Sequence, residues 1–222
     1  MQNKLFISFF ICLLSVTQFS CVPKNNSKRI IVASYGKVES LDPARVTTLK
    51  AFQLLASLGD TLYVLNSDGK LLPQLALGMP IISDDKLKIT INLKENIYFH
   101  DGTQFDAKAM KFTIDRFRRI GINNYILGDK INFVETPSKF QLVLNLNKPS
   151  SSINALLTSL NLTPISPTFY KDYSNKFLND SFIGTGKYLL KNFSNEKQLI
   201  EPNARYWGVQ PKNYGINFIG YE

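Results

Sequence analysis

Histidine, cysteine and acidic residues are scarce in this chain of 222 residues, and each shortage excludes a class of site. His100 is the only histidine, which excludes metal sites built from several histidines and leaves one candidate base for a catalytic triad. The 17 aspartate and glutamate residues are too sparse to support a calcium-binding loop. Gly184-Thr185-Gly186 lacks the Lys-Ser/Thr pair that follows in a phosphate loop. We therefore expect no metal, no cofactor and no enzymatic activity.

Long hydrophobic runs are also lacking. The apolar run Leu5–Val16 is too short for a comfortable transmembrane helix, so residues 1–21 are predicted to form an export signal. The end of this segment, Thr17–Cys21, resembles a bacterial lipobox, with Gln18 in place of the usual leucine. It predicts that Cys21 carries a lipid anchor, and an ordinary cleaved signal in which this cysteine is incidental is the alternative.

A disulfide is excluded by the same argument. The chain has only Cys12 and Cys21, and Cys12 would leave with the signal. The mature protein must therefore be stabilised by burial of a core, even in an oxidising compartment. Residues 22–28 are polar and predict a short tether. We expect a periplasmic protein that a lipid anchor attaches to a membrane.

The positive charge is the next feature of the composition. The formal net charge is +9, from 26 lysine and arginine residues that are scattered along the chain. An exported protein meets no nucleic acid, so we do not expect a nucleic-acid partner. A basic surface close to an anionic membrane and plain solubility are the two remaining explanations.

Hydrophobic periodicity predicts a mixed set of strands and helices. Arg29–Ser34 is expected to be a buried first strand, and Asn66–Gly69 is a turn of the kind that joins two strands. Lys86–Lys94 alternates between apolar and polar residues, and Phe140–Leu146 repeats the pattern, so both are predicted strands.

Helical spacing and capping residues mark the helices between these strands. Thr47 or Thr48 can cap a helix, and Asp106 opens another. Ser150–Ser152 precedes a third, and Ser166-Pro167 starts a fourth by a cap followed by proline. The apolar stripes of the first three are, in order, Ala51, Leu54, Leu55 and Leu58; Met110, Ile114 and Phe117; and Ile153, Leu156, Leu157 and Leu160. Because strands and helices do not alternate regularly, the predicted fold class is α+β.

Two segments carry residues that a binding or catalytic site could use. His100-Asp101 lies in a predicted turn that runs to Thr103, and a local hydrogen-bonding role is more typical of such a dipeptide than general-base catalysis. Tyr206-Trp207 can stack on a sugar or a peptide side chain if the rings are exposed. Burial of both rings in the core is the favoured alternative, because large aromatic side chains are highly buried on average.

Several short motifs together resemble the peptide/nickel-type extracellular solute-binding proteins of ABC transporters, known as family 5. They occur in the order known for that family over residues 30 to 219. Lys187 and Gln104–Asp106 depart from the family pattern, because proline is usual at both places. The motifs are Leu41-Asp42-Pro43, Asp60–Tyr63, Gly69–Ala76, Ser83–Asp85, Leu93–Asn96, Phe99–Thr103, Leu144–Pro149, Ile165–Pro167, Gly184–Tyr188 and Asn203–Trp207.

The resemblance implies a receptor that captures a peptide or similar small solute and delivers it to a permease and ATPase complex in the inner membrane. Proteins of this family consist of two lobes joined by a hinge, with the ligand enclosed between them. Residues 29–222 look like the N-terminal lobe, with residues 46–160 as its accessory subdomain and the second lobe absent. A truncated or vestigial surface lipoprotein without ligand-binding activity is the alternative function.

The resemblance also implies where the ligand would bind. The segment after Leu-Asp-Pro runs along the ligand cleft in the family, and here it is Thr47-Thr48-Leu49. Its hydroxyls and backbone groups suit a peptide or polar solute, while the helix cap is an equally weighted interpretation of the two threonines. Tyr125, in the loop after the helix that ends near Arg119, is a further candidate for a ring that faces the cleft.

Overall fold

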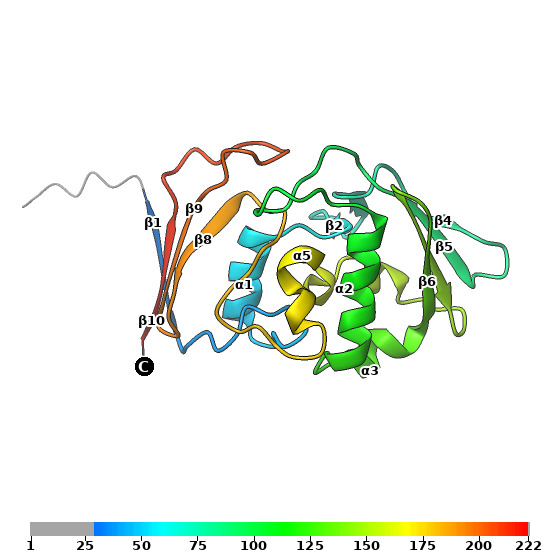
Figure 1. Ribbon diagram of the computed structural model, residues 1–222, viewed down its shortest axis with the longest axis horizontal. Coiled ribbons are helices and arrows are strands. Elements are labelled where there is room, and N and C mark those ends of the chain that lie inside the picture. The colour runs from blue at the N-terminus through cyan, green and yellow to red at the C-terminus, as the bar shows by residue number, and fades with distance from the viewer. Residues whose placement is uncertain (1–28, 222) are drawn as a thin grey trace, which may run out of the picture.

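The computed structural model describes residues 29–221, and Figure 1 shows how its elements are arranged. The predicted export signal, the lipidated Cys21 and the tether lie outside the described residues. Within residues 29–221, no helix is both long enough and apolar enough to cross a membrane.

The first sheet contains the two ends of the described chain. Its strand order is β1-β10-β9-β8, where β1 and β10 run parallel and the other pairs are antiparallel. Its strands are β1 (Ile30–Tyr35), β8 (Tyr188–Phe193), β9 (Lys197–Pro202) and β10 (Ile216–Tyr221). The prediction of a strand at 29–34 is confirmed, but its predicted burial is wrong. As the edge strand, β1 has a neighbour on one side only, and Ile31 is 59% exposed while Val32 packs against the core.

The second sheet lies at the opposite end of the molecule (Figure 1). It is antiparallel, in the order β4-β5-β7-β6, and the two predicted alternating strands β5 and β7 pair at its centre. Their apolar faces align, because Ile89 is opposite Leu144 and Ile91 is opposite Leu142. The strands are β4 (Ile81–Ile82), β5 (Lys88–Asn92), β6 (Ile131–Ser138) and β7 (Gln141–Leu146). A separate hairpin of β2 (Tyr63–Leu65) and β3 (Leu71–Pro73) closes through the predicted turn, in which Gly69 has a φ of +74°.

The helices lie between the two sheets and begin where the capping residues predict. Thr48, Asp106 and Ser166 each accept a hydrogen bond from a backbone N–H of the first turn that follows. The α-helices are α1 (Leu49–Leu58), α2 (Ala107–Ile120), α3 (Asn124–Leu127), α4 (Ile153–Leu157) and α5 (Pro167–Tyr170). The short 3₁₀ segments are η1 (Gly128–Lys130), η2 (Leu160–Leu162) and η3 (Lys171–Tyr173). The helix predicted through Leu160 is shorter than expected, because α4 ends at Leu157 and Leu160 begins η2.

Two hydrophobic clusters form the core. The first cluster packs α2 against β5 and β7, and its members include Ile89, Ile91, Met110, Ile114, Phe117, Leu142 and Leu144. The second cluster packs α1 against the first sheet and α5, and its members include Leu41, Leu54, Leu55, Leu58, Tyr170, Tyr188, Ile200 and Phe218. The subdomain boundaries at 46 and 160 stay a prediction.

A buried ion pair connects the two clusters. Arg116 of α2 and Asp42 are 1% and 0% exposed, and the guanidinium donates to both carboxylate oxygens at 2.8 and 2.5 Å. The same guanidinium also donates to the carbonyls of Tyr173 and Lys176. The aspartate of the Leu-Asp-Pro motif is therefore an anchor for α2, which is the physical reason for a carboxylate at this buried position.

Candidate functional site

The predicted ligand-binding segment lies on the surface at the N-terminal end of α1. Thr47 and Thr48 are exposed, and Leu49 is 74% exposed. The two threonines line a small pocket of about 30 Å³ together with Glu39 and Arg45. The pocket therefore offers hydroxyl groups and charges of both signs to a solute.

Thr48 has a structural role in this segment. Its hydroxyl oxygen accepts from the N–H of Ala51 at 3.4 Å and caps α1. The cap leaves the hydroxyl proton of Thr48 free to donate, and the Thr47 side chain does not serve as the cap. The cap therefore does not exclude a ligand contact, and the ligand-binding role of both residues stays a prediction.

The backbone before this segment is held from inside the protein. Asp42 accepts from the N–H groups of Ala44 and Leu178 at 3.0 and 2.7 Å. Asn161 donates from its side-chain nitrogen to the carbonyls of Pro43 and Val46 at 2.7 and 3.1 Å. A loop fixed by four such bonds presents the following threonines in one arrangement, which lowers the entropic cost of binding.

Tyr125 lies apart from this pocket. It is 64% exposed on α3 and does not line the cavity beside Thr47. Its proposed role in ligand binding stays a prediction.

The segment His100–Thr103 forms the predicted turn, and its carboxylate is used locally. Asp101 accepts from the N–H and the hydroxyl of Thr103 at 2.9 and 2.6 Å, and Gly102 has a φ of +84°. Asp101 also accepts from the hydroxyl of Ser166 at 2.5 Å, which ties the turn to the cap of α5. These bonds occupy the carboxylate of Asp101 within the fold.

His100 itself is bonded to a distant segment rather than to its neighbour Asp101. Its Nε2 lies 3.0 Å from the carbonyl oxygen of Gly186, so this nitrogen carries the proton. Burial lowers the pKa of His100 below its ordinary value, against the opposing effects of the Gly186 carbonyl and Asp101. The ring is therefore neutral at pH 7 and serves to hold two loops together.

Asp60, the first residue of the motif Asp60–Tyr63, is a buried carboxylate whose structural role the sequence alone did not predict. It is 3% exposed and accepts four hydrogen bonds, all from neutral side chains. The donors are Gln74 at 2.9 Å, Thr185 at 2.9 Å, Tyr206 at 3.0 Å and Trp207 at 3.0 Å. Burial raises the pKa of Asp60, and the hydrogen bonds oppose this rise.

These contacts with Asp60 give structural roles to the motif Gly184-Thr185-Gly186 and to the pair Tyr206-Trp207. Thr185 of Gly184-Thr185-Gly186 donates its hydroxyl proton to Asp60, so this side chain has a structural role in the interior. Tyr206 and Trp207 are half-buried and donate to the same carboxylate, and Trp207 packs against the first cluster. The favoured alternative, burial of both rings in the core, is supported in part, because both rings are half-buried and Trp207 alone of the two packs against a core cluster. No sequence spacing indicated the Asp60 site, because its partners are distant along the chain.

A metal site finds no support in the part of the chain that the structure describes. No group of three or more histidine, cysteine, aspartate or glutamate side chains among residues 29–221 is arranged to hold an ion.

Comparison with known proteins identifies the relatives of this chain. The model of the bacterial extracellular solute-binding proteins, family 5 Middle, matches residues 70–222. The probable D,D-dipeptide-binding periplasmic protein DdpA of Escherichia coli K12 is 28% identical over 145 residues, which are 62% of this chain and 28% of that protein. The glutathione-binding protein GsiB of Salmonella paratyphi A is 27% identical over 194 residues, which are 86% of this chain and 38% of that protein.

Solved structures share the fold. OppA of Listeria monocytogenes bound to peptide is 21% identical with a TM-score of 0.78, covering 88% of this chain and 43% of that chain. NikZ of Campylobacter jejuni in complex with Ni(L-His) is 20% identical with a TM-score of 0.76, covering 88% of this chain and 39% of that chain. These neighbours are two-lobed periplasmic binding proteins, and the predicted α+β fold of one such lobe is confirmed. The chain spans 28% to 38% of the length of the two curated relatives described above.

Proposed function

This chain belongs to family 5 of the bacterial extracellular solute-binding proteins, and we propose that it captures peptides or similar small solutes for an ABC importer. The observation that carries the proposal is the match of the family over residues 70–222, which is most of the chain. Proteins of this family bind solutes for transport and are not enzymes.

The names of the relatives support a peptide-like solute. DdpA is described as binding D,D-dipeptides, GsiB as binding glutathione, and the OppA structure contains a peptide. NikZ was solved with nickel bound to histidine, so amino-acid-derived chelates belong to the same range of solutes. In this proposal the partners of the protein are the inner-membrane permease and its ATPase.

We place the solute at the exposed segment Thr47-Thr48-Leu49, with Tyr125 as a second contact. The support is the exposure of this segment, its position on a loop fixed by Asp42 and Asn161, and its free hydroxyl groups. Backbone and hydroxyl groups recognise the peptide main chain without selecting its sequence.

The proposed location is the periplasmic side of the inner membrane. Export would depend on residues 1–21, and a lipid on Cys21 would keep the receptor close to the permease. Mass spectrometry of the membrane fraction tests this part, because a lipidated Cys21 adds the mass of the lipid to the N-terminal peptide. An unmodified N-terminus after cleavage elsewhere would contradict the anchor.

Calorimetric titration with dipeptides, tripeptides and glutathione tests the proposed activity. We expect saturable binding of at least one peptide class by the wild-type protein. Replacing Thr47 by Val keeps the shape of the side chain and removes one hydrogen bond, so affinity should fall about twofold to tenfold.

The matched control is Thr168→Val, because Thr168 is exposed on α5 and lies outside the proposed site. Thr48→Ser keeps both the hydroxyl and the helix cap, so it should bind peptide as tightly as the wild type. Replacing Tyr125 by Ala tests the ring in the same titration. If Thr47→Val and Thr168→Val bound peptide equally well, the proposed contact at Thr47 would be wrong. If the wild-type protein bound no peptide at all, the proposed activity would be wrong.

A further inference from the structure

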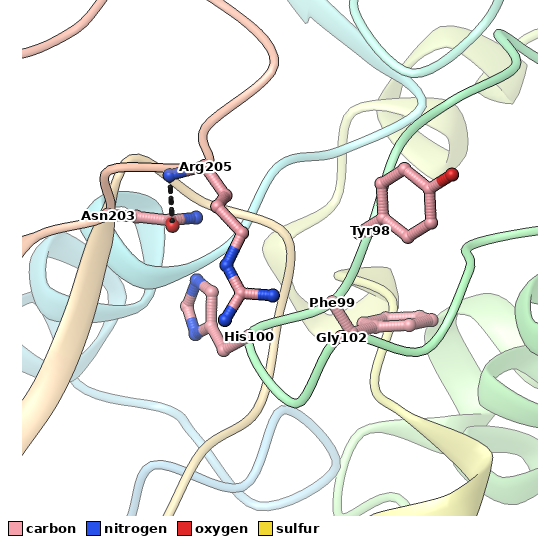
Figure 2. Close-up of a pocket in the computed structure, with 6 residues that line it drawn as sticks. All are labelled: Tyr98, Phe99, His100, Gly102, Asn203 and Arg205. Carbon is pink, nitrogen blue, oxygen red and sulfur yellow. Dashed lines mark hydrogen bonds between the residues drawn. The ribbon is translucent and has the colours of Figure 1, made fainter.

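A second cavity lies between the turn at residues 98–102 and the turn at residues 203–205. It has a volume of about 220 Å³. Figure 2 shows Arg205 extending from one turn towards His100, with Tyr98 and Phe99 on the other side. The lining residues are Tyr98, Phe99, His100, Gly102, Asn203 and Arg205.

The two turns are fixed to each other by shared hydrogen bonds. The carbonyl of Gly186 accepts from His100 Nε2 at 3.0 Å and from the Asn203 side chain at 3.1 Å. The backbone N–H of His100 also donates to the carbonyl of Gly184 at 2.9 Å. Asn203 then accepts from the backbone N–H of Arg205 at 3.0 Å (Figure 2). The cavity is therefore formed before any ligand arrives.

Arg205 supplies a positive charge at this cavity that forms no ion pair with the described residues. Among residues 29–221, its guanidinium has neither a carboxylate nor another hydrogen-bonding partner. Asp101, the acidic residue of the opposite turn, accepts from Thr103 and Ser166 and makes no hydrogen bond to Arg205. His100 adds no second charge at pH 7, because burial lowers its pKa and the ring is neutral.

The walls of the cavity limit the kind of anion that fits. Tyr98 is half-exposed and offers a ring, whereas Phe99 is 3% exposed and belongs to the first cluster. At about 30 Å³ for each water molecule, the cavity holds roughly seven water-sized groups, so the occupant is smaller than a typical drug-sized ligand. A fully hydrated inorganic anion would leave the aromatic wall without a favourable contact.

We propose that this cavity binds a small organic carboxylate, whose charged group pairs with Arg205 and whose apolar group lies against the ring of Tyr98. The planar guanidinium matches a carboxylate through two parallel hydrogen bonds. The aromatic wall favours a carboxylate that carries a ring or a branched apolar group.

The cavity is separate from the proposed solute site at Thr47. Gly186, which accepts from the lining residues His100 and Asn203, donates to the carbonyl of Leu58, the last residue of α1, whereas Thr48 caps the first turn of that helix. A helix of ten residues is about 15 Å long, so the two sites lie at opposite ends of it. The inference therefore does not depend on the proposed peptide binding.

Titration of the purified protein with benzoate tests the inference. Calorimetry should show saturable binding of benzoate, with weaker binding of benzyl alcohol, which has the ring but no charge, and of inorganic phosphate. Trp207 is the only tryptophan and follows Arg205 by two residues, so its fluorescence provides an independent signal. Arg205→Gln should weaken benzoate about tenfold or more, and Arg205→Lys should weaken it less.

Two controls keep the test specific. Lys212→Gln removes one positive charge from an exposed position outside the cavity and should bind benzoate like the wild type. Tyr98→Ala should weaken benzoate but not acetate, because acetate has no ring to pack. Thermal unfolding of each variant checks that the fold is retained. The inference is overturned if benzoate does not saturate, if Arg205→Gln binds it unchanged, or if phosphate binds as tightly as benzoate.

Discussion

At the scale of single residues, two buried carboxylates of the sequence motifs serve the fold. Asp42 of the Leu-Asp-Pro motif is paired with Arg116 inside the core, and Asp60 accepts from four neutral donors. Both are almost completely buried, so neither carboxylate is available to a solute in this arrangement. Without these carboxylates, the neighbouring donors would lose their hydrogen-bonding partners in the interior.

Replacement of Arg116 by Met should destabilise the protein strongly. The substitution keeps much of the side-chain volume but leaves the Asp42 carboxylate buried without its cation, which costs about 3–5 kcal/mol in comparable cases. Urea unfolding followed by circular dichroism measures the loss. Arg118→Met is the matched control on the same helix, because the Arg118 side chain is 31% exposed and its ion pair with Asp115 lies at the surface. That variant should change the free energy of unfolding by less than about 1 kcal/mol, and equal losses in both variants would contradict the role given to the pair.

At the scale of elements, the Gly-Thr-Gly segment shows why some residues must be small. A Cβ atom on Gly186 would lie 2.3 Å from the carbonyl carbon of Leu58 and 2.5 Å from the nitrogen of Gly59. These are backbone atoms at the end of α1, and they cannot turn away as a flexible side chain would. The glycine therefore lets β8 approach the end of the helix.

Gly186→Ala should lower the free energy of unfolding by about 1–3 kcal/mol, the usual cost of overpacking a well-packed interior. A Cβ atom on Gly78 would meet no atom within 4 Å, so Gly78→Ala tests the same chemical change without the clash. Thermal and urea unfolding of the two variants give the comparison. A Gly186→Ala protein as stable as Gly78→Ala would show that the backbone of α1 can shift without cost.

Elements whose signals are local were predictable from the sequence. Thr48 and Asp106 cap the helices that their spacing predicts, and the alternating residues of β5 and β7 pair at the centre of one sheet. The burial of β1 was not predictable, because an apolar run does not reveal whether a strand lies at the edge of its sheet. α4 ends before the apolar stripe that suggested it, since a stripe continues through Leu160 whether or not the backbone stays helical.

The candidate sites, like the helices and strands, were predictable only where the sequence signal is local. The exposed position of Thr47 and the loop before it agree with the motif that suggested them, although ligand contact itself is untested. Three of the four hydrogen bonds of Asp60, and the cavity beside Arg205, join segments more than a hundred residues apart, and no spacing rule connects such positions. Only the folded chain brings them together.

At the scale of the whole molecule, two clusters are connected by polar bridges. Arg116 and Asp42 link α2 of the first cluster to the loop beside Leu41 of the second. Asp60 follows the end of α1 and binds Trp207, which packs against the first cluster. The helices between the two sheets in Figure 1 therefore belong to one connected interior.

Because removing either bridge leaves a buried charge or donor unsatisfied, one cluster cannot unfold without a large cost to the other. We therefore expect a single cooperative transition in urea, as in small single domains. Trp207 fluorescence reports on the first cluster, and hydrogen exchange of the α1 amides reports on the second, so the two probes should give the same free energy of opening. In Arg118→Met the two probes should still give the same free energy of opening. In Arg116→Met the free energy of opening should fall by the same amount at both probes. Two separate midpoints in the wild-type protein would mean that the clusters unfold independently and that the buried bridges do not couple them.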